Sequence, residues 1–131
     1  MPLKPRVVII DDEASHRMLV RRALRELGGE IDEIESVAVA RQRLTSGAFN
    51  FDLVFLDLNL AGTPGTAVLM EIRKIFKFSE LPVVVLSTSA LDIDVHGAYA
   101  AGANSYLVKS SNSEELRKTL IAAAKYFLQA F

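Results

Sequence analysis

The sequence contains no cysteine and carries almost no net charge, and both absences narrow what the chain can do. Without cysteine there are no disulfides, no thiolate chemistry and no cysteine metal sites, a composition that suits a reducing cytoplasm. A formal net charge of -1 gives no electrostatic basis for binding nucleic acid or a membrane surface. We therefore expect a cytoplasmic protein that contacts neither nucleic acid nor membrane.

Long apolar stretches are also missing. No run approaches the roughly 20 apolar residues that a membrane-spanning helix needs. Residues 1–6 lead directly into a strand-like segment, without the apolar region and cleavage site of a secretion signal, so secretion is not expected. A length of 131 residues, half of them hydrophobic and 24% charged, predicts one globular domain over residues 1–131.

Short apolar runs alternate with longer segments of helical periodicity. The strand-like runs are residues 6–11 (RVVIID), 31–37, 52–57 (DLVFLD), 82–87 (PVVVLS) and 104–108. The helical patterns cover residues 14–27, 38–46, 66–77, 91–101 and 113–130. The segment over residues 58–65 is predicted to be a loop.

This strict alternation of five strands and five helices predicts the fold class. Near-continuous apolar strands are typical of a parallel sheet that is buried on both faces. Right-handed crossovers then produce an α/β protein, a three-layer α/β/α sandwich around a five-stranded, doubly wound, flavodoxin-like sheet. In such a sheet, functional groups collect at the carboxyl ends of the strands.

Polar residues stand at those strand ends. Asp11 and Asp12 close the first strand, Asp57 the third, Ser87 the fourth, and Lys109 follows the fifth. Clustered carboxylates repel one another, and a hard cation such as Mg²⁺, which prefers oxygen ligands, relieves that repulsion. A cation beside a carboxylate nucleophile indicates phosphoryl transfer, a reaction that depends on neutralising the phosphoryl oxygens.

Four segments carry a family resemblance: VVIIDDE, DLVFLDLNL with Gly65 after it, LPVVVLSTS and AGANSYLVKS. In order and spacing they resemble the receiver domain of two-component response regulators over essentially the full chain. The resemblance implies a CheY-like fold and a phosphoryl group received from a sensor histidine kinase or a histidine phosphotransfer protein. The LSTS and ANSYLVK runs resemble single-domain regulators found near phytochrome-type kinases.

The resemblance also implies roles for individual residues. Asp57 is the phosphoacceptor. Asp11 and Asp12 are the acid pair that binds Mg²⁺, together with Asp57 and the backbone carbonyl of Asn59. Such a protein is a switch rather than an enzyme, because it catalyses only its own phosphorylation and its slow dephosphorylation.

Ser87 matches the residue that binds the phosphoryl group, Lys109 matches the lysine that pairs with it, and Tyr106 matches the aromatic switch position. The resemblance implies that signalling proceeds through the surface of the fourth helix, fifth strand and fifth helix, toward a downstream protein or a second copy of the chain. Apolar residues off the core stripe of the last helix form such a surface or fold back on the core: Ile121, Leu128 and Phe131.

Three positions depart from the family pattern. Ala61 replaces the usual proline, Thr88 replaces a small residue, and Ser110 replaces a proline that normally follows the lysine in a cis bond. A cis bond before a non-proline residue costs roughly 3 kcal/mol. Either the chain bears that strain, or Lys109 is positioned differently.

The first predicted helix carries two further features. His16 lies in register with its apolar stripe, and we expect it to pack against the core rather than carry a phosphoryl group. Arg17, Arg21 and Arg25 recur every four residues and so share one face. That face is either solvated or a docking surface for the kinase.

Three alternatives remain for the function. A haloacid-dehalogenase-type phosphatase uses similar groups, but its nucleophile ends the first strand and its acid pair comes late. A nucleotide- or flavin-binding module would need a glycine-rich phosphate loop, which follows none of the strands. A pseudo-receiver that binds partners without phosphorylation is disfavoured because Asp57, Ser87 and Lys109 are all present.

Overall fold

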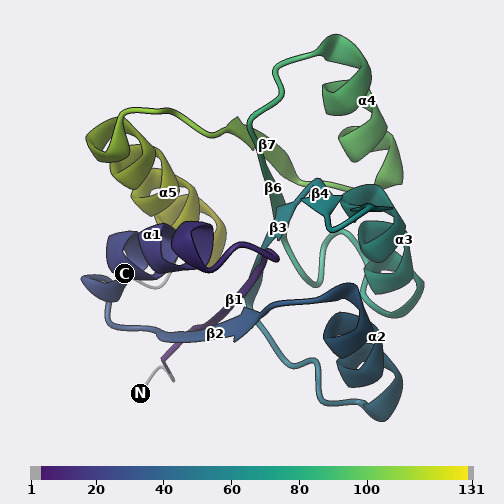
Figure 1. The fold of residues 1–131 in the computed structure, drawn as a ribbon. Helices are drawn as coiled ribbons and strands as arrows, with labels where there is room; N and C mark the ends of the chain where they lie inside the picture. Colours follow the sequence, from purple (N-terminus) through teal and green to yellow (C-terminus); the bar gives the residue numbers. More distant parts are fainter. Residues whose placement is uncertain (1–3, 130–131) are drawn as a thin grey trace.

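The computed structural model describes residues 4–129, which form a three-layer α/β/α sandwich (Figure 1). The central parallel sheet has the strand order β2-β1-β3-β6-β7, which is the predicted flavodoxin-like order. Its strands are β1 (Arg6–Ile10), β2 (Glu30–Ile34), β3 (Leu53–Asp57), β6 (Val83–Ser87) and β7 (Ser105–Val108). The helices are α1 (Ala14–Arg25), α2 (Val37–Ser46), α3 (Gly65–Ile75), α4 (Asp92–Ala101) and α5 (Ser113–Leu128).

The helices divide between the two faces of the sheet, with α1 and α5 on one face and α2, α3 and α4 on the other (Figure 1). The side chains of β1 point alternately to the two faces of the sheet, and both faces are covered by helices. Val8 and Ile10 pack in the core under α2, α3 and α4, whereas Val7 and Ile9 pack in the core under α1 and α5. All four side chains are buried, so the continuous apolar run is explained by a strand with no solvated face.

The segment predicted to be a loop contains a small antiparallel hairpin, formed by β4 (Asn59–Leu60) and β5 (Thr63–Pro64). Its turn passes through Ala61 and Gly62, which both have positive φ angles, 46° and 88°. Each strand has only two residues, too few for a periodic sequence signal, so the prediction of a simple loop was wrong here.

Gly65 begins α3 directly against the end of β3. Its backbone N–H donates to the carbonyl of Leu58 at 2.6 Å, and a side chain at this position would overlap the backbone carbonyl of Asp57. Only glycine allows this approach. The glycine therefore fixes how the chain leaves the residue predicted to be phosphorylated.

Most element boundaries agree with the sequence patterns to within two residues. The exception is β2, which ends at Ile34, three residues before the end of the strand predicted over residues 31–37. Phe131, one of the three surplus apolar residues of the last helix, lies outside the described residues, whereas Ile121 and Leu128 are half-buried.

Candidate functional site

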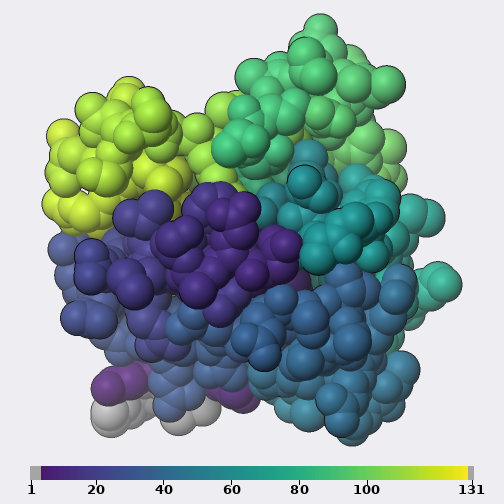
Figure 2. All heavy atoms as spheres, viewed as in Figure 1, coloured from purple at the N-terminus to yellow at the C-terminus, as the bar shows by residue number. Residues whose placement is uncertain are grey.

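The register of the sheet brings the predicted groups to one edge. Neighbouring strands end together, with the Cα pairs Ile10–Leu56, Asp57–Leu86 and Ser87–Val108. Asp11, Asp57, Ser87 and Lys109 therefore all stand at the carboxyl ends of adjacent strands. In Figure 2 the segment that follows β1 (purple) lies beside the hairpin that follows β3 (teal), and Asp12 lines a small cavity together with Leu60 of that hairpin.

Lys109 links the two buried carboxylates of the site. Its Nζ atom lies 3.2 Å from Oδ2 of Asp11 and 3.3 Å from Oδ2 of Asp57. The side chains of Lys109 and Asp57 are each 11% exposed, and that of Asp11 is 4% exposed. Such charges attract one another strongly because little water screens them. One ammonium group thus serves two acids.

Lys109 reaches these acids without a cis peptide bond. All peptide bonds within residues 4–129 are trans, including the bond between Lys109 and Ser110. Ser110 has a different role, because its Oγ accepts from the N–H of Asn112 at 3.0 Å and donates to Glu115 at 3.2 Å. The structure matches neither of the two possibilities left open by the sequence, because the bond is trans and Lys109 still contacts Asp57.

The Asp57 carboxyl group lies in an unfavourable environment for a negative charge. Burial raises the pKa of Asp57, and the neighbouring Asp11 raises it further, while the backbone N–H of Asn59 and the Lys109 ammonium partly offset the rise. The N–H of Asn59 donates to Oδ1 of Asp57 at 3.1 Å. Burial and the second carboxylate thus outweigh the favourable partners of the Asp57 carboxylate. A divalent cation with oxygen ligands fits this group of donors.

Ser87 is buried at the end of β6 and begins a chain of contacts toward α4. Its Oγ accepts from the N–H of Ser89 at 3.1 Å. The carbonyl of Ser89 accepts from the hydroxyl of Tyr106 at 2.8 Å, and the Ser89 hydroxyl donates to Asp94 of α4 at 2.5 Å. Tyr106 also packs, half-buried, against the core. The segment after β6 is thus bonded to β7 and to α4.

His16 belongs to the site, which the sequence did not indicate. Its Nδ1 atom lies 2.9 Å from Nζ of Lys109 and 3.4 Å from Oδ2 of Asp11. His16 is partly buried, as expected, but it contacts polar groups of the site as well. That it does not carry a phosphoryl group stays a prediction. A signal was present: residue 16 lies in the first turn of the helix that follows the strand ending at Asp11.

Asp12 is placed differently from Asp11. Its side chain is exposed and lines a cavity of about 130 Å³ with Glu35 and Ser36 on the α2 side. The acidic and imidazole groups that the described structure brings within 4.8 Å of one another are those of Asp11, His16 and Asp57. The role of Asp12 as a metal ligand remains a prediction.

The arginine face of α1 is bonded to the neighbouring strand. Arg17 donates to Glu33 at 3.0 Å and to the carbonyl of Asp11 at 2.8 Å, and Arg21 donates to Glu33 at 2.7 Å. Partial burial by itself raises the pKa of Glu33, but hydrogen bonds and charge from Arg21 and Arg17 outweigh it and lower the pKa. Arg17 and Arg21 therefore hold α1 on β2, and only Arg25 of the three is exposed.

Comparison with known proteins identifies the family. The sequence profile described as "Response regulator receiver domain" matches residues 7–121. The "Probable methanogenesis regulatory protein FilR2" of Methanothrix harundinacea is 34% identical over 128 residues, which cover 93% of this chain and 83% of that protein. These matches favour a receiver over the phosphatase and nucleotide-binding alternatives.

Solved structures agree with the sequence comparison. The phosphorylated cyanobacterial phytochrome response regulator RcpA superposes with a TM-score of 0.87 at 27% identity, covering 98% of this chain and 97% of that one. The Mn(2+)-bound form of response regulator Rcp1 gives a TM-score of 0.79 at 27% identity, with coverages of 97% and 96%. No helix within residues 4–129 is long and apolar enough to cross a membrane. The chain belongs to the receiver domains of two-component response regulators, the phosphoacceptor modules of these signalling systems.

Proposed function

We propose that Asp57 is the phosphoacceptor of this receiver, and that the phosphoryl group comes from a histidine of a sensor kinase or phosphotransfer protein. The observation that carries this proposal is the contact of Lys109 with both Asp57 and Asp11 at the carboxyl edge of the sheet. Among the residues at this edge, Asp57 ends the central strand β3, and its carboxyl group has a raised pKa. Its Oδ1 also accepts a hydrogen bond from the backbone N–H of Asn59.

In the transfer, a carboxylate oxygen of Asp57 attacks phosphorus in line with the phosphorus–nitrogen bond of the donor. The new phosphorus–oxygen bond forms as the phosphorus–nitrogen bond breaks, and the donor imidazole leaves with its electron pair. Lys109, which contacts Asp57, and the buried Ser87 hydroxyl would balance charge on the transferred oxygens. The product is an aspartyl phosphate, which water then hydrolyses slowly without an external enzyme.

The oxygen ligands proposed for Mg²⁺ are the carboxylates of Asp11, Asp12 and Asp57 and the backbone carbonyl of Asn59. The exposed side chain of Asp12 would have to turn toward the site to join them. When bound, the cation supplies positive charge beside the phosphoryl oxygens. The Mn(2+)-bound structure of Rcp1 supports a divalent cation in receivers of this type.

The signal would leave through the contacts that start at Ser87. In the structure the Ser87 hydroxyl oxygen accepts a hydrogen bond from the N–H of Ser89. Once Asp57 is phosphorylated, the new acceptor oxygens of the phosphoryl group attract the Ser87 hydroxyl. Because Ser89 is bonded to Tyr106 and Asp94, the rearrangement changes the packing of β7 and α4.

The surface of α4 and β7 that would change on phosphorylation carries exposed apolar side chains. Leu91 at the start of α4 and Ile93 within it are 65% and 77% exposed, and Tyr99 and Val108 are each nearly half exposed. We propose this α4–β7–α5 surface as the interface for a downstream protein or for a second copy of the chain. The likeness to RcpA supports a phytochrome-type kinase as the phosphoryl donor.

The test is incubation with acetyl phosphate and Mg²⁺ followed by measurement of the intact mass. Wild type should gain one phosphoryl group, and Asp57→Asn should gain none. Asp52→Asn is the matched control, since Asp52 precedes the same strand at its opposite end. A mass gain that persists in Asp57→Asn, or that is insensitive to EDTA, would contradict the proposal.

A further inference from the structure

His16 presents a nitrogen lone pair to the acidic site. Its Nδ1 atom lies 2.9 Å from the Lys109 ammonium, which is a donor only, so Nδ1 is the acceptor of this bond. The ring proton is therefore on Nε2, which lies 3.3 Å from Oε2 of Glu13. Glu13 thus places a carboxylate near the outer nitrogen of the ring, at ion-pair distance.

This pairing of a carboxylate with the outer nitrogen of a histidine is the usual support for a metal-binding imidazole. The inner nitrogen here faces two carboxylates, and the ligand atoms of Asp11, His16 and Asp57 lie within 4.8 Å of one another. A cation with ligand bonds of about 2.0–2.2 Å holds two ligands at most about 4.4 Å apart, so the most widely separated of these atoms must approach one another. Small side-chain movements are enough to close the shell.

The Lys109 ammonium occupies the position between Asp11, His16 and Asp57. Its Nζ atom lies 3.2 and 3.3 Å from the oxygens of Asp11 and Asp57 and 2.9 Å from the nitrogen of His16. The ammonium thus contacts the same three ligand atoms that a metal ion would bind. A divalent cation at this point would displace Lys109, which is the group proposed to face the phosphoryl oxygens.

The identity of the third ligand decides which cation is preferred. Mg²⁺ favours all-oxygen sites, whereas imidazole nitrogen favours Zn²⁺ and the later transition metals. We propose that Asp11, His16 and Asp57 bind Zn²⁺ or a similar transition-metal cation, and that this cation competes with Mg²⁺ for the site. The inference rests on the proposed function in one respect, namely that a cation binds beside Asp57.

Calorimetric titration with Zn²⁺ alone and with Mg²⁺ alone tests the proposal on wild type, His16→Gln and His96→Gln. His96 is the other histidine of the chain and is exposed on α4, so its substitution is the matched control. Loss of the His16 ligand should weaken Zn²⁺ binding by at least about tenfold, and by a larger factor than it weakens Mg²⁺ binding. His96→Gln should bind Zn²⁺ as wild type does. Equal Zn²⁺ affinities in wild type and His16→Gln would overturn the proposal.

A spectroscopic measurement reads the ligand directly and guards against a folding defect in the variant. With one equivalent of Cu²⁺, the paramagnetic resonance spectrum of wild type and of His96→Gln should show nitrogen coupling, and that of His16→Gln should lose it. Absence of nitrogen coupling in wild type, or its persistence in His16→Gln, contradicts the assignment. Phosphorylation of wild type by acetyl phosphate with Mg²⁺ is measured on the same preparation, so failure of the phosphoacceptor proposal remains distinguishable from failure of the His16 proposal.

Discussion

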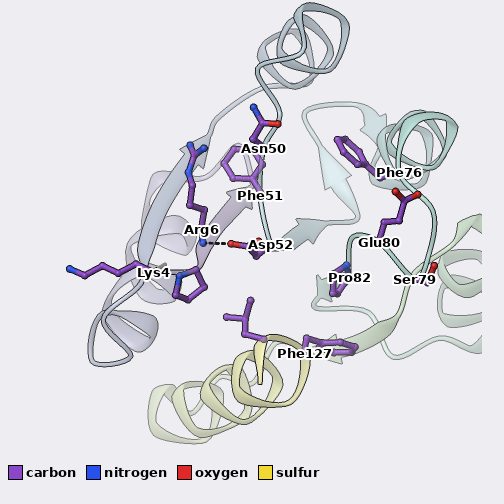
Figure 3. Close-up of a pocket in the computed structure, with 12 residues that line it drawn as sticks. Lys4, Arg6, Asn50, Phe51, Asp52, Phe76, Ser79, Glu80, Pro82 and Phe127 are labelled. Carbon is purple, nitrogen blue, oxygen red and sulfur yellow. Dashed lines mark hydrogen bonds between the residues drawn. The ribbon is translucent and has the colours of Figure 1, made fainter. Parts of the chain in front are cut away.

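The two ends of the central sheet differ in the size of the cavity beside them and in the charged groups that they bury. At the amino ends of β1, β3 and β6 lies a cavity of about 680 Å³, lined by Lys4, Arg6, Asp52 and Glu80 among others (Figure 3). At the carboxyl ends, the cavity beside Ser87 and the β4–β5 hairpin measures about 540 Å³. The larger cavity lies at the end away from the residues matched to the family.

Several charged groups of the amino end have hydrogen-bond or ion-pair partners of their own. The backbone N–H of Arg6 donates to Asp52 at 2.7 Å, as Figure 3 shows, and its guanidinium lies 3.2 Å from Asp32. Glu80 accepts from the N–H of Lys77 at 3.0 Å. At the carboxyl end, one lysine serves two buried acids and an imidazole. The proposed site thus differs from the opposite end of the sheet in its buried, shared charges rather than in cavity size.

The largest difference between the two ends should appear when a lysine is removed from each. Lys109→Met should slow phosphorylation by acetyl phosphate on the order of 10²-fold, because a positive group facing the phosphoryl oxygens is lost. Lys4→Met, at the amino-end cavity, should leave the rate unchanged. Time courses of intact mass with Mg²⁺ measure both. Equal phosphorylation rates in Lys109→Met and Lys4→Met would show that the lysine at the carboxyl end has no special role in the reaction.

A second comparison uses the two acids that flank β3. A raised pKa in the folded state means that the fold loses stability as the pH rises between the unfolded-state and folded-state pKa values. At pH 7 without metal, Asp57→Asn should therefore increase the free energy of unfolding by about 1 kcal/mol. Asp52→Asn should change it by less than about 0.5 kcal/mol, because Asp52 is exposed. Urea unfolding in EDTA measures both, and a destabilised Asp57→Asn would contradict the argument.

Much of this contrast could be predicted from the sequence. The alternation of apolar runs specifies a parallel sheet, and a parallel sheet places the ends of its strands together. The positions of Asp11, Asp57, Ser87 and Lys109 at one edge follow from that rule alone.

The direction of a side chain beyond a strand end was not predictable. Asp11 and Asp12 are adjacent in the sequence, yet one is buried in the site and the other is exposed, since the turn into α1 has no periodic pattern. The contact of His16 with Lys109 joins residues 93 positions apart. Likewise, the pairing of Arg17 and Arg21 with one glutamate depends on how α1 crosses β2.

Tyr106→Phe tests whether movement is confined to one part of the molecule. The change removes the hydrogen bond to the carbonyl of Ser89, a contribution of about 1 kcal/mol, and should speed hydrogen exchange over residues 88–101. In wild type, beryllofluoride with Mg²⁺ should alter exchange over residues 88–108 and leave the amino-end residues 48–53 unchanged. Changes confined to α1 and α2 would place the responsive surface elsewhere.

The smallest effect concerns Glu33, a carboxylate of β2 that lies next to the functional edge but is balanced by two arginines. Its pKa is lowered in the fold, so its stabilising contribution is present above the unfolded-state pKa of about 4.3 and is lost as the pH falls through the folded-state value. Glu33→Gln should lower the free energy of unfolding by about 0.5 kcal/mol at pH 7, a modest value because water screens this partly exposed pair. The loss of stability caused by Glu33→Gln should vanish in acid. Asp57→Asn instead increases the free energy of unfolding, and this gain should also vanish in acid. Urea unfolding from pH 7 down to about pH 3 measures both trends, with the exposed Glu35→Gln as control. A Glu33→Gln difference that stays constant with pH would show that the arginines hold α1 on β2 by packing rather than by charge.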